Sequence, residues 1–369
     1  MKIGIEAERA NLPNPTGVER YAAELIRQLA RIGGAHEYVL YFRTQPQDWF
    51  YQLPKNFRIR VIPFPKFWTQ IRISWELLLH PVDALLILAS ALPIYHPKRS
   101  LFTAHDVAFE MFPEAFTPFM LKYQKWSTRF AVRHAARILS VSEATKRDLV
   151  KFYGIDPAKI DVTPLGFDSA KFHPQGYEEV QSVLDKYGLV YQKYVLFVGT
   201  IQPRKNLEKL AEAFHQLRTQ NHVEEKLAIF GARGWLWEPI VEKIKALGAD
   251  GSIKYFDYAS KEDLPFLYAG ARLLTLPALY EGFGLPPLEA MASGVPVVVS
   301  NISSLPEVAG DAGVLVDPNS ADSIAAGLLR VLTDPQLREN MIAKGLARAK
   351  EFAWENTARK TLAAIESLK

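Results

Sequence analysis

The stretch Glu281-Gly-Phe-Gly-Leu-Pro-Pro-Leu-Glu289 places a glycine turn directly before the start of a short helix. Pro286 and Pro287 suit a first helical turn, because the N–H groups that they lack would have no partner there. The backbone amides of the turn and of the first helical residue then point outward from a helix N-terminus. Such a terminus binds anions, phosphate above all. The amides concerned belong to Gly282, Phe283, Gly284 and Leu285.

Two carboxylates flank this anion site. Glu281 lies just before it and Glu289 lies about one turn inside the helix. A carboxylate close to phosphate is repelled, so both side chains are better suited to binding hydroxyl groups. Phosphate between two hydroxyl-rich groups describes a nucleotide-sugar. On position alone, the pair can also be two surface carboxylates around a turn.

Outward from this stretch, short β-rich apolar runs alternate with segments of helical periodicity. This alternation predicts an α/β fold with parallel sheets. A helix is expected over 18–32, with Thr16 and Glu19 at capping-box spacing. The expected strands lie near 2–6, 37–42, 58–62, 83–88, 100–104, 137–141, 160–163, 194–199, 226–230, 252–256, 272–276, 296–299 and 313–316.

The length of 369 residues predicts two domains. A segment rich in Pro, Gly and polar residues, 167–177, is the candidate linker. We expect two Rossmann-like domains that face each other across a cleft, 1–173 and 174–352, followed by a helix over 353–369. Ligands of such sheets bind beyond the carboxyl ends of the strands.

A second candidate anion site is Gly199-Thr-Ile-Gln-Pro-Arg-Lys-Asn206, which follows an apolar strand. Two adjacent cations at a strand end, Arg204 and Lys205, would neutralise a diphosphate as it departs. The simpler interpretation is a solvated basic pair.

Six ordered segments resemble family 4 glycosyltransferases, which are retaining enzymes of the GT-B fold. Glu281–Glu289 resembles their E-x7-E signature, and the other segments are 16–21, 163–168, 198–207, 264–271 and 304–311. The resemblance implies a GT-B fold with an acceptor-binding domain over 1–173 and a nucleotide-sugar-binding domain over 174–352. It also implies that the C-terminal helix crosses back to the first domain.

The resemblance also assigns roles in the donor site. Glu289 would hold the ribose hydroxyls, Glu281 the hydroxyls of the donor sugar, and the amides of 282–285 the sugar and phosphate. Arg204 and Lys205 would bind the diphosphate. Many relatives have Arg directly after the strand glycine, where this chain has Thr200.

Two residues of the first half complete the candidate site. His105 ends an apolar strand and resembles the family histidine near the donor sugar and acceptor, which implies positioning or proton handling. Gly17 begins the first long helix, and the family's turn at this place approaches the donor phosphate. A structural histidine and an ordinary helix start are the simpler interpretations.

The resemblance implies transfer of a hexose from a nucleoside-diphosphate sugar to a hydroxyl with retention of anomeric configuration. GDP-mannose is the first choice, because the Pro-Arg-Lys-Asn-Leu form resembles mannosyl- and rhamnosyltransferases of bacterial surface glycans. No Asp-x-Asp occurs, so no metal and no cofactor are expected. A nucleotide-sugar epimerase of the same fold and a non-catalytic nucleotide-sugar-binding scaffold remain alternatives. A dehydrogenase would need G-x-G-x-x-G after the first strand, which is absent.

Composition bears on location and partners. The chain has no cysteine, which is typical of a reducing compartment, and Met-Lys-Ile-Gly-Ile-Glu at its start is expected to form a strand and not a signal peptide. Residues 1–173 carry a charge of +7 and 174–369 a charge of −3. We expect a cytoplasmic protein that binds a nucleotide-sugar and a saccharide or lipid-linked acceptor, and no nucleic acid.

One further segment is compatible with a peripheral membrane contact. Aromatic and basic residues share helical spacing over 111–137, which suits either an anionic membrane surface or a core.

Overall fold

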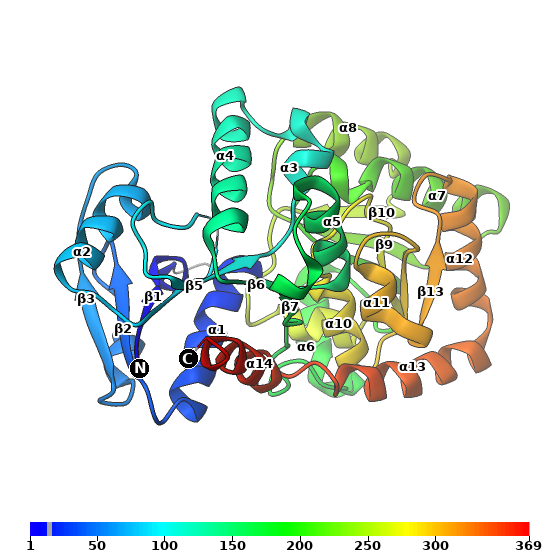
Figure 1. Ribbon diagram of the computed structural model, residues 1–369. Coiled ribbons are helices and arrows are strands. Elements are labelled where there is room, and N and C mark those ends of the chain that lie inside the picture. The colour runs from blue at the N-terminus through cyan, green and yellow to red at the C-terminus, as the bar shows by residue number, and fades with distance from the viewer. Residues whose placement is uncertain (13–16, 90, 369) are drawn as a thin grey trace. The chain divides into compact units, whose positions relative to one another are not determined.

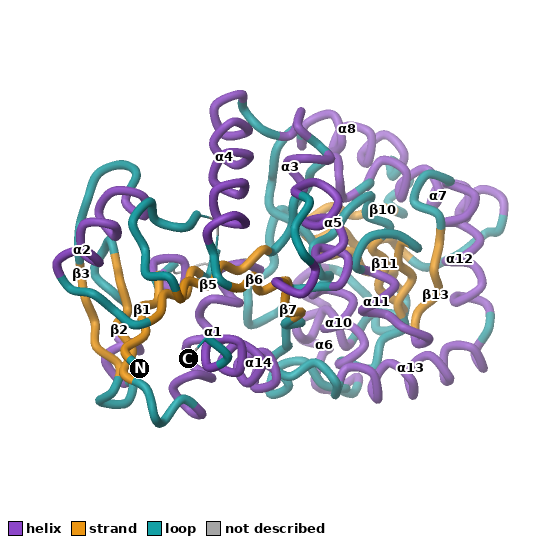
Figure 2. The backbone as a smooth tube through the Cα atoms, in the orientation of Figure 1, coloured by secondary structure: helices purple, strands orange, loops and turns teal. Residues whose placement is uncertain are grey.

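The computed structural model describes residues 1–12, 17–89 and 91–368. Two compact units are present: residues 1–166 together with 353–369, and residues 167–352. Each is built around one parallel sheet, and Figure 2 shows the strands of both sheets in orange. The predicted pair of Rossmann-like α/β domains is therefore confirmed.

The first unit has a seven-stranded sheet in the order β3-β2-β1-β4-β5-β6-β7. Its strands are Lys2–Glu6 (β1), Glu37–Phe42 (β2), Phe57–Val61 (β3), Ala84–Ile87 (β4), Arg99–Ala104 (β5), Arg137–Ser140 (β6) and Ile160–Val162 (β7). Strand order reverses between β1 and β4, which is the topological switch point of this sheet. Strands such as β1 and β4 have almost no exposed residues, as expected of a sheet covered on both faces.

Helices cover both faces of this sheet (Figure 1). They are Gly17–Ile32 (α1), Ser74–Leu79 (α2), Ala108–Met111 (α3), Pro118–His134 (α4), Glu143–Tyr153 (α5) and Trp354–Glu366 (α14). The first of them, predicted over 18–32, begins at Gly17. Its predicted cap, Thr16, lies outside the described residues. A π-helical segment, Trp68–Ile73, precedes α2.

The C-terminal helix belongs to the first unit, as the resemblance implied. Helices α14 and α1 lie side by side in Figures 1 and 2. Tyr21 of α1 packs against Trp354, with ring centroids 6.3 Å apart, and Thr357 donates to the Pro164 carbonyl at 2.6 Å. Gly166 has its backbone against that of Trp354: a Cβ atom on Gly166 would lie 2.2 Å from the Trp354 nitrogen.

The second unit has a six-stranded sheet in the order β10-β9-β8-β11-β12-β13. Its strands are Tyr194–Val198 (β8), Lys226–Phe230 (β9), Ile253–Phe256 (β10), Leu273–Leu276 (β11), Val297–Ser300 (β12) and Gly313–Val316 (β13). Its helices are Tyr177–Tyr187 (α6), Leu207–Gln220 (α7), Trp237–Leu247 (α8), Leu264–Ala269 (α9), Leu285–Ala292 (α10), Leu305–Ala309 (α11), Ala321–Thr333 (α12) and Pro335–Ala349 (α13). Here the switch point lies between β8 and β11.

The first unit's initial segment ends at Gly166, seven residues before the expected boundary at 173. The intervening residues pack with the second unit: Phe172 is buried, and its ring meets that of Tyr268 edge-to-face at 5.5 Å. The polar composition of this segment indicated a linker but carried no information about which core Phe172 joins.

Candidate functional site

The loops that follow β8 and β11 are tied together at the switch point of the second unit. After β8, a 3-10 turn (Pro203–Lys205) leads to Asn206, which has the left-handed φ of 61°. The Asn206 amide donates to the Pro277 carbonyl at 2.9 Å and to the Pro318 carbonyl at 2.6 Å, and the Leu279 N–H donates to the Arg204 carbonyl at 2.8 Å. The loop after β8 is thereby fixed against the loop after β11.

This arrangement brings Arg204, Lys205 and Glu281 together. The Lys205 ammonium donates to Glu281 Oε1, and Arg204 Nη1 lies 3.5 Å from Oε2 of the same carboxylate. Arg204 Nη1 also donates to the Tyr280 carbonyl at 3.0 Å. Lys205 and Glu281 are only 7% and 8% exposed. Among these three groups two cations face one anion, and this arrangement suits a phosphate group.

The charge state of Glu281 follows from its neighbours. Burial by itself raises the pKa of this carboxyl, but the charges and hydrogen bonds of Lys205 and Arg204 outweigh burial and hold its pKa below the usual value. Glu281 is therefore a carboxylate at neutral pH. It orients both cations, in addition to the sugar-binding role that the resemblance implies for it.

Two serines hold the turn after Glu281. Ser303 donates to the Glu281 carbonyl at 2.6 Å, and the Ser304 hydroxyl lies 2.8 Å from that carbonyl and 2.7 Å from the carbonyl of Phe283. Gly284 then adopts φ 108°, where a Cβ atom would also meet Leu305 at 2.8 Å. Only glycine fits this position. Helix α10 begins at Leu285 with both prolines in its first turn, as predicted.

Three other predicted residues of this unit differ in burial: two are buried and one is exposed. Glu289 lies in α10 and is buried, with 4% of its surface exposed. The Thr200 side chain is exposed and follows β8 closely. Phe283 is buried, and its ring meets that of Phe352 at 5.8 Å.

His105 lies in the first unit, directly after β5. Its Nε2 is 2.9 Å from the Leu88 carbonyl, and its ring meets Tyr21 edge-to-face at 4.9 Å. Burial lowers the pKa of His105, which keeps the imidazole neutral at pH 7. Since Nε2 must carry the proton to donate to Leu88, the lone pair resides on Nδ1, which can accept a proton.

Gly17 is the first residue of α1, and the four residues before it lie outside the described part of the chain. The neighbour of His105, Asp106, accepts a hydrogen bond from the Ala108 N–H at 3.0 Å and so begins α3. Its carboxylate therefore has a local structural role.

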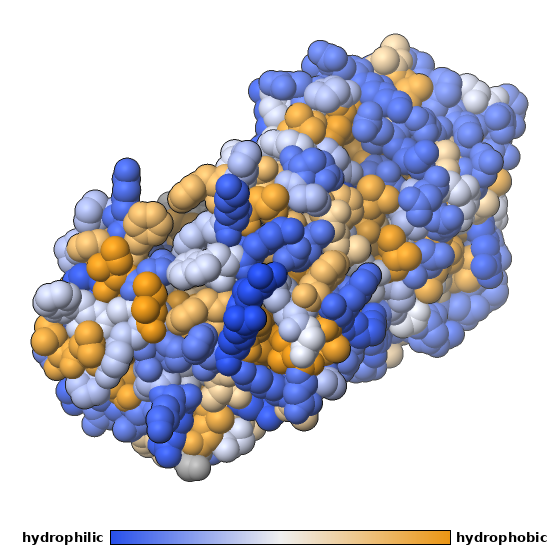
Figure 3. Space-filling model, turned by 45° about the horizontal axis from the view of Figure 1, so that its top comes forward, coloured by the Kyte–Doolittle hydropathy of each residue, from blue (hydrophilic) through white to orange (hydrophobic). Residues whose placement is uncertain are grey.

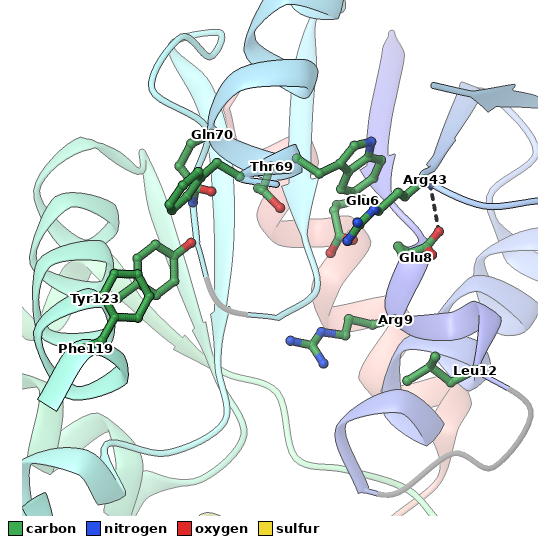
Figure 4. A pocket seen from close by; sticks show the side chains of 11 residues that line it. Glu6, Glu8, Arg9, Leu12, Arg43, Thr69, Gln70, Phe119 and Tyr123 are labelled. Carbon is green, nitrogen blue, oxygen red and sulfur yellow. Dashed lines mark hydrogen bonds between the residues drawn. The ribbon is translucent and has the colours of Figure 1, made fainter. Parts of the chain in front are cut away.

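Sequence reasoning missed a cavity of about 470 Å³ in the first unit (Figure 4). Its polar lining includes Glu6, the last residue of β1, which is buried. Burial raises the pKa of Glu6 to about 7, even though the charge of Arg9 and a backbone hydrogen bond from Glu8 act in the opposite direction. A single carboxylate at a strand end belongs to no spaced motif; its position at the switch point was the available signal.

Two further properties concern membranes and metals. No helix within residues 1–12, 17–89 and 91–368 is long and apolar enough to cross a bilayer. Over the same residues, no three His, Asp or Glu side chains gather in an arrangement that could hold a metal ion.

Comparison with known proteins agrees with the geometry of both units. The family model described as "Glycosyltransferase Family 4" matches residues 15–171, and that described as "Glycosyl transferases group 1" matches residues 185–348. The O-antigen chain mannosyltransferase B of Escherichia coli is 35% identical to this chain, with all of both proteins covered. The MMP alpha-(1->4)-mannosyltransferase of Mycolicibacterium hassiacum is 33% identical over 63% of this chain and 54% of its own length.

Solved structures share the fold at lower identity. Sucrose-phosphate synthase of Thermosynechococcus elongatus superposes with a TM-score of 0.77 at 16% identity, covering 100% of this chain and 98% of its own. HepE of Anabaena, in complex with UDP and glucose, superposes with a TM-score of 0.75 at 17% identity, covering 100% of both chains. On the strength of the two matched family models and the full-length relative, this chain belongs to glycosyltransferase family 4.

Proposed function

We propose that this protein is a retaining hexosyltransferase that moves mannose from GDP-mannose to a hydroxyl of a saccharide or lipid-linked acceptor in surface glycan synthesis. The observation that carries the proposal is the cluster of Arg204, Lys205 and Glu281 at the switch point between β8 and β11. The full-length relative, an O-antigen chain mannosyltransferase, supports mannose as the donor sugar.

The donor's diphosphate would bind Arg204 and Lys205. Arg offers a planar fork and Lys a point charge, and in a buried site neither has to be reorganised as the leaving group becomes more negative. The amides of 282–285 and the N-terminus of α10 add further positive potential. Glu289, inside α10, would bind the ribose hydroxyls, and Glu281 those of the mannose.

In the proposed reaction the bond between the anomeric carbon and the diphosphate oxygen breaks, and a bond from that carbon to the acceptor oxygen forms on the same face. The acceptor hydroxyl proton passes to the departing phosphate oxygen. No protein nucleophile is required, and Arg204 and Lys205 stabilise the charge that develops on the diphosphate. His105, neutral with its lone pair on Nδ1, would position the sugar or acceptor hydroxyls.

Helix α4 supports a peripheral position on the inner face of an anionic cytoplasmic membrane. Its small residues face the core, since Ser127, Thr128, Ala131 and Val132 are buried. Phe119 is 68% exposed and Trp126 is 46% exposed. Many of the large apolar residues at the surface lie in the first unit, and Figure 3 shows apolar side chains gathered in several places on the visible surface. Aromatic and basic side chains on one helix suit the headgroup region.

Incubation with GDP-mannose and mannoside acceptors tests the proposal. We expect release of GDP together with a saccharide product one hexose larger, whose new linkage has the α configuration of the donor by NMR. An epimerase would release free or rearranged sugar whether or not an acceptor is present. A scaffold would bind the nucleotide-sugar and release nothing.

A further inference from the structure

The cavity lined by Glu6 has the size and lining of a binding site, and none of the donor-site residues lines it. It lies beyond the carboxyl ends of β1 and β2, because Glu6 ends β1 and Arg43 directly follows β2. Its volume of about 470 Å³ is in the range of small-molecule sites. All of its lining residues belong to the first unit.

One wall of the cavity is aromatic. Figure 4 shows Tyr123 and Phe119, both from α4, on one side of the cavity, opposite Arg9 and Glu8. Trp68 also lines it and is held in place by a hydrogen bond from its Nε1 to the Ile62 carbonyl at 2.7 Å. Fixed aromatic rings offer flat faces on which the C–H groups of a sugar ring can pack.

The polar groups suit hydroxyls. Gln70 lines the cavity, and its side-chain amide forms a hydrogen bond with the Tyr123 hydroxyl. The amide oxygen of Gln70 and the Tyr123 hydroxyl can each accept a further hydrogen bond from a sugar hydroxyl. Glu6 has a buried carboxyl that can accept from hydroxyls when ionised and also donate to them when protonated.

The charges of the cavity argue against an anionic ligand. Arg9 lies 3.5 Å from the Glu19 carboxylate, and the Arg43 guanidinium donates to the Pro65 carbonyl at 2.6 Å. Two carboxylates, Glu8 in the lining and Glu19 beside Arg9, balance these two arginines. The site therefore presents no surplus cation.

The backbone that forms the cavity is also unusual. Phe67 has the left-handed φ of 52°, a conformation that costs free energy for a bulky residue, and it leads into the π-helical segment that carries Trp68, Thr69 and Gln70. Strained residues and π-helical turns are both frequent at functional sites. Both features occur at this cavity.

Arg9 connects the cavity with the candidate reaction centre. It lies 3.5 Å from the carboxylate of Glu19 in α1, and Tyr21 of the same helix meets the His105 ring at 4.9 Å. We propose that the cavity is a subsite for a neutral hexose ring of the acceptor saccharide, with Tyr123 as its stacking platform and Glu6 and Gln70 as its hydroxyl-binding groups. The assignment to an acceptor rests on the proposed function.

Binding of saccharides to the full-length protein tests the subsite without any donor. The probes are an α-linked mannotriose and a sulfated disaccharide, titrated by ligand-observed NMR. We expect mannotriose to bind. Tyr123→Leu and Glu6→Leu should each weaken its binding about tenfold, the loss expected for a stacking surface or a hydrogen bond to a carboxyl. Tyr95→Leu removes an exposed tyrosine of the same unit that does not line the cavity, and should bind as the wild type does.

Three outcomes would overturn the subsite: no mannotriose binding, stronger binding of the sulfated sugar, or Tyr123→Leu indistinguishable from Tyr95→Leu. If Glu6→Leu does not fold, the comparison of Tyr123→Leu with Tyr95→Leu is sufficient to test the subsite. Thermal shifts with GDP on the same samples separate this proposal from the proposed function. A protein that binds mannotriose through Tyr123 but binds no nucleoside diphosphate supports the subsite and counts against glycosyl transfer.

Discussion

Lys205 and Glu281 are 76 positions apart in the chain and form a buried ion pair in the second unit. The pair exists because β8 and β11 are neighbours in the sheet, so that the loops after them meet at one edge. Glu281 thus binds the two cations that the diphosphate is expected to meet. One consequence is that removing either member changes both stability and the charge available to the donor.

Replacement of Glu281 by Leu should destabilise the protein and abolish transfer. Loss of the carboxylate deprives buried Lys205 of its ion-pair partner, a change that typically costs about 3–5 kcal/mol. Urea unfolding and steady-state transfer rates measure the two effects. The double variant Lys205→Met/Glu281→Leu is the matched control, because it removes both charges: we expect recovered stability and no activity. Equal stability of the single and double variants would show that the pair is not coupled.

Glu6 should make stability depend on pH. Its pKa in the folded protein is raised to about 7, from 4.5. A carboxyl with a raised folded-state pKa stabilises the fold below pH 4.5, and this contribution is lost as the pH rises through 7. The change corresponds to roughly 3 kcal/mol, at 1.36 kcal/mol for each pKa unit. Glu6→Gln cannot ionise and should gain about that amount relative to the wild type between pH 4.5 and pH 8. Parallel pH profiles of the two proteins in urea unfolding would contradict the raised pKa.

Gly166 should be essential for docking the C-terminal helix. Since a Cβ atom would lie 2.2 Å from the Trp354 nitrogen, Gly166→Ala forces the two backbone segments apart. Overpacking of this kind costs about 1–3 kcal/mol. Gly34→Ala is the control, because nothing lies within 4 Å of a Cβ atom placed there. Hydrogen exchange of α14 amides should accelerate in the first variant only; equal exchange in both would refute the contact.

Activity should survive EDTA, because the chain has no Asp-x-Asp and the leaving diphosphate has Arg204 and Lys205 as counter-charges. The measurement is the transfer rate in EDTA against the rate after addition of Mn²⁺. A rate lost in EDTA and restored by Mn²⁺ would refute metal independence.

The sheets could be predicted from the sequence because their signals are local. Short apolar runs such as Tyr194–Val198 and Val297–Ser300 are typical of parallel strands that are covered on both faces. The turn at Gly284 and the start of α10 could also be predicted. Glycine allows backbone conformations that other residues avoid, and proline fixes φ at a value that suits a first helical turn.

Contacts between distant residues could not be predicted. Both Lys205 and Glu281 were candidates, but their pairing depends on which strands are neighbours. Gln70 was missed because it lies in a π-helical segment, whose spacing matches neither the helical nor the strand period. The location of the aromatic residues of α4 could not be predicted, because an aromatic stripe at helical spacing usually forms a buried face. In the structure Phe119 is exposed, and small residues of α4 face the core.

The donor site is tested most directly by the thermal stability of the protein with GDP, UDP, dTDP and ADP, repeated for Arg204→Ala and Glu289→Ala. A ligand at a hundredfold excess over its Kd stabilises the native state by about 2.7 kcal/mol. We predict that GDP raises the melting temperature of the wild type and that both variants lose this response. An unchanged melting temperature with every nucleotide, or a response that persists in both variants, would contradict a donor site between β8 and β11.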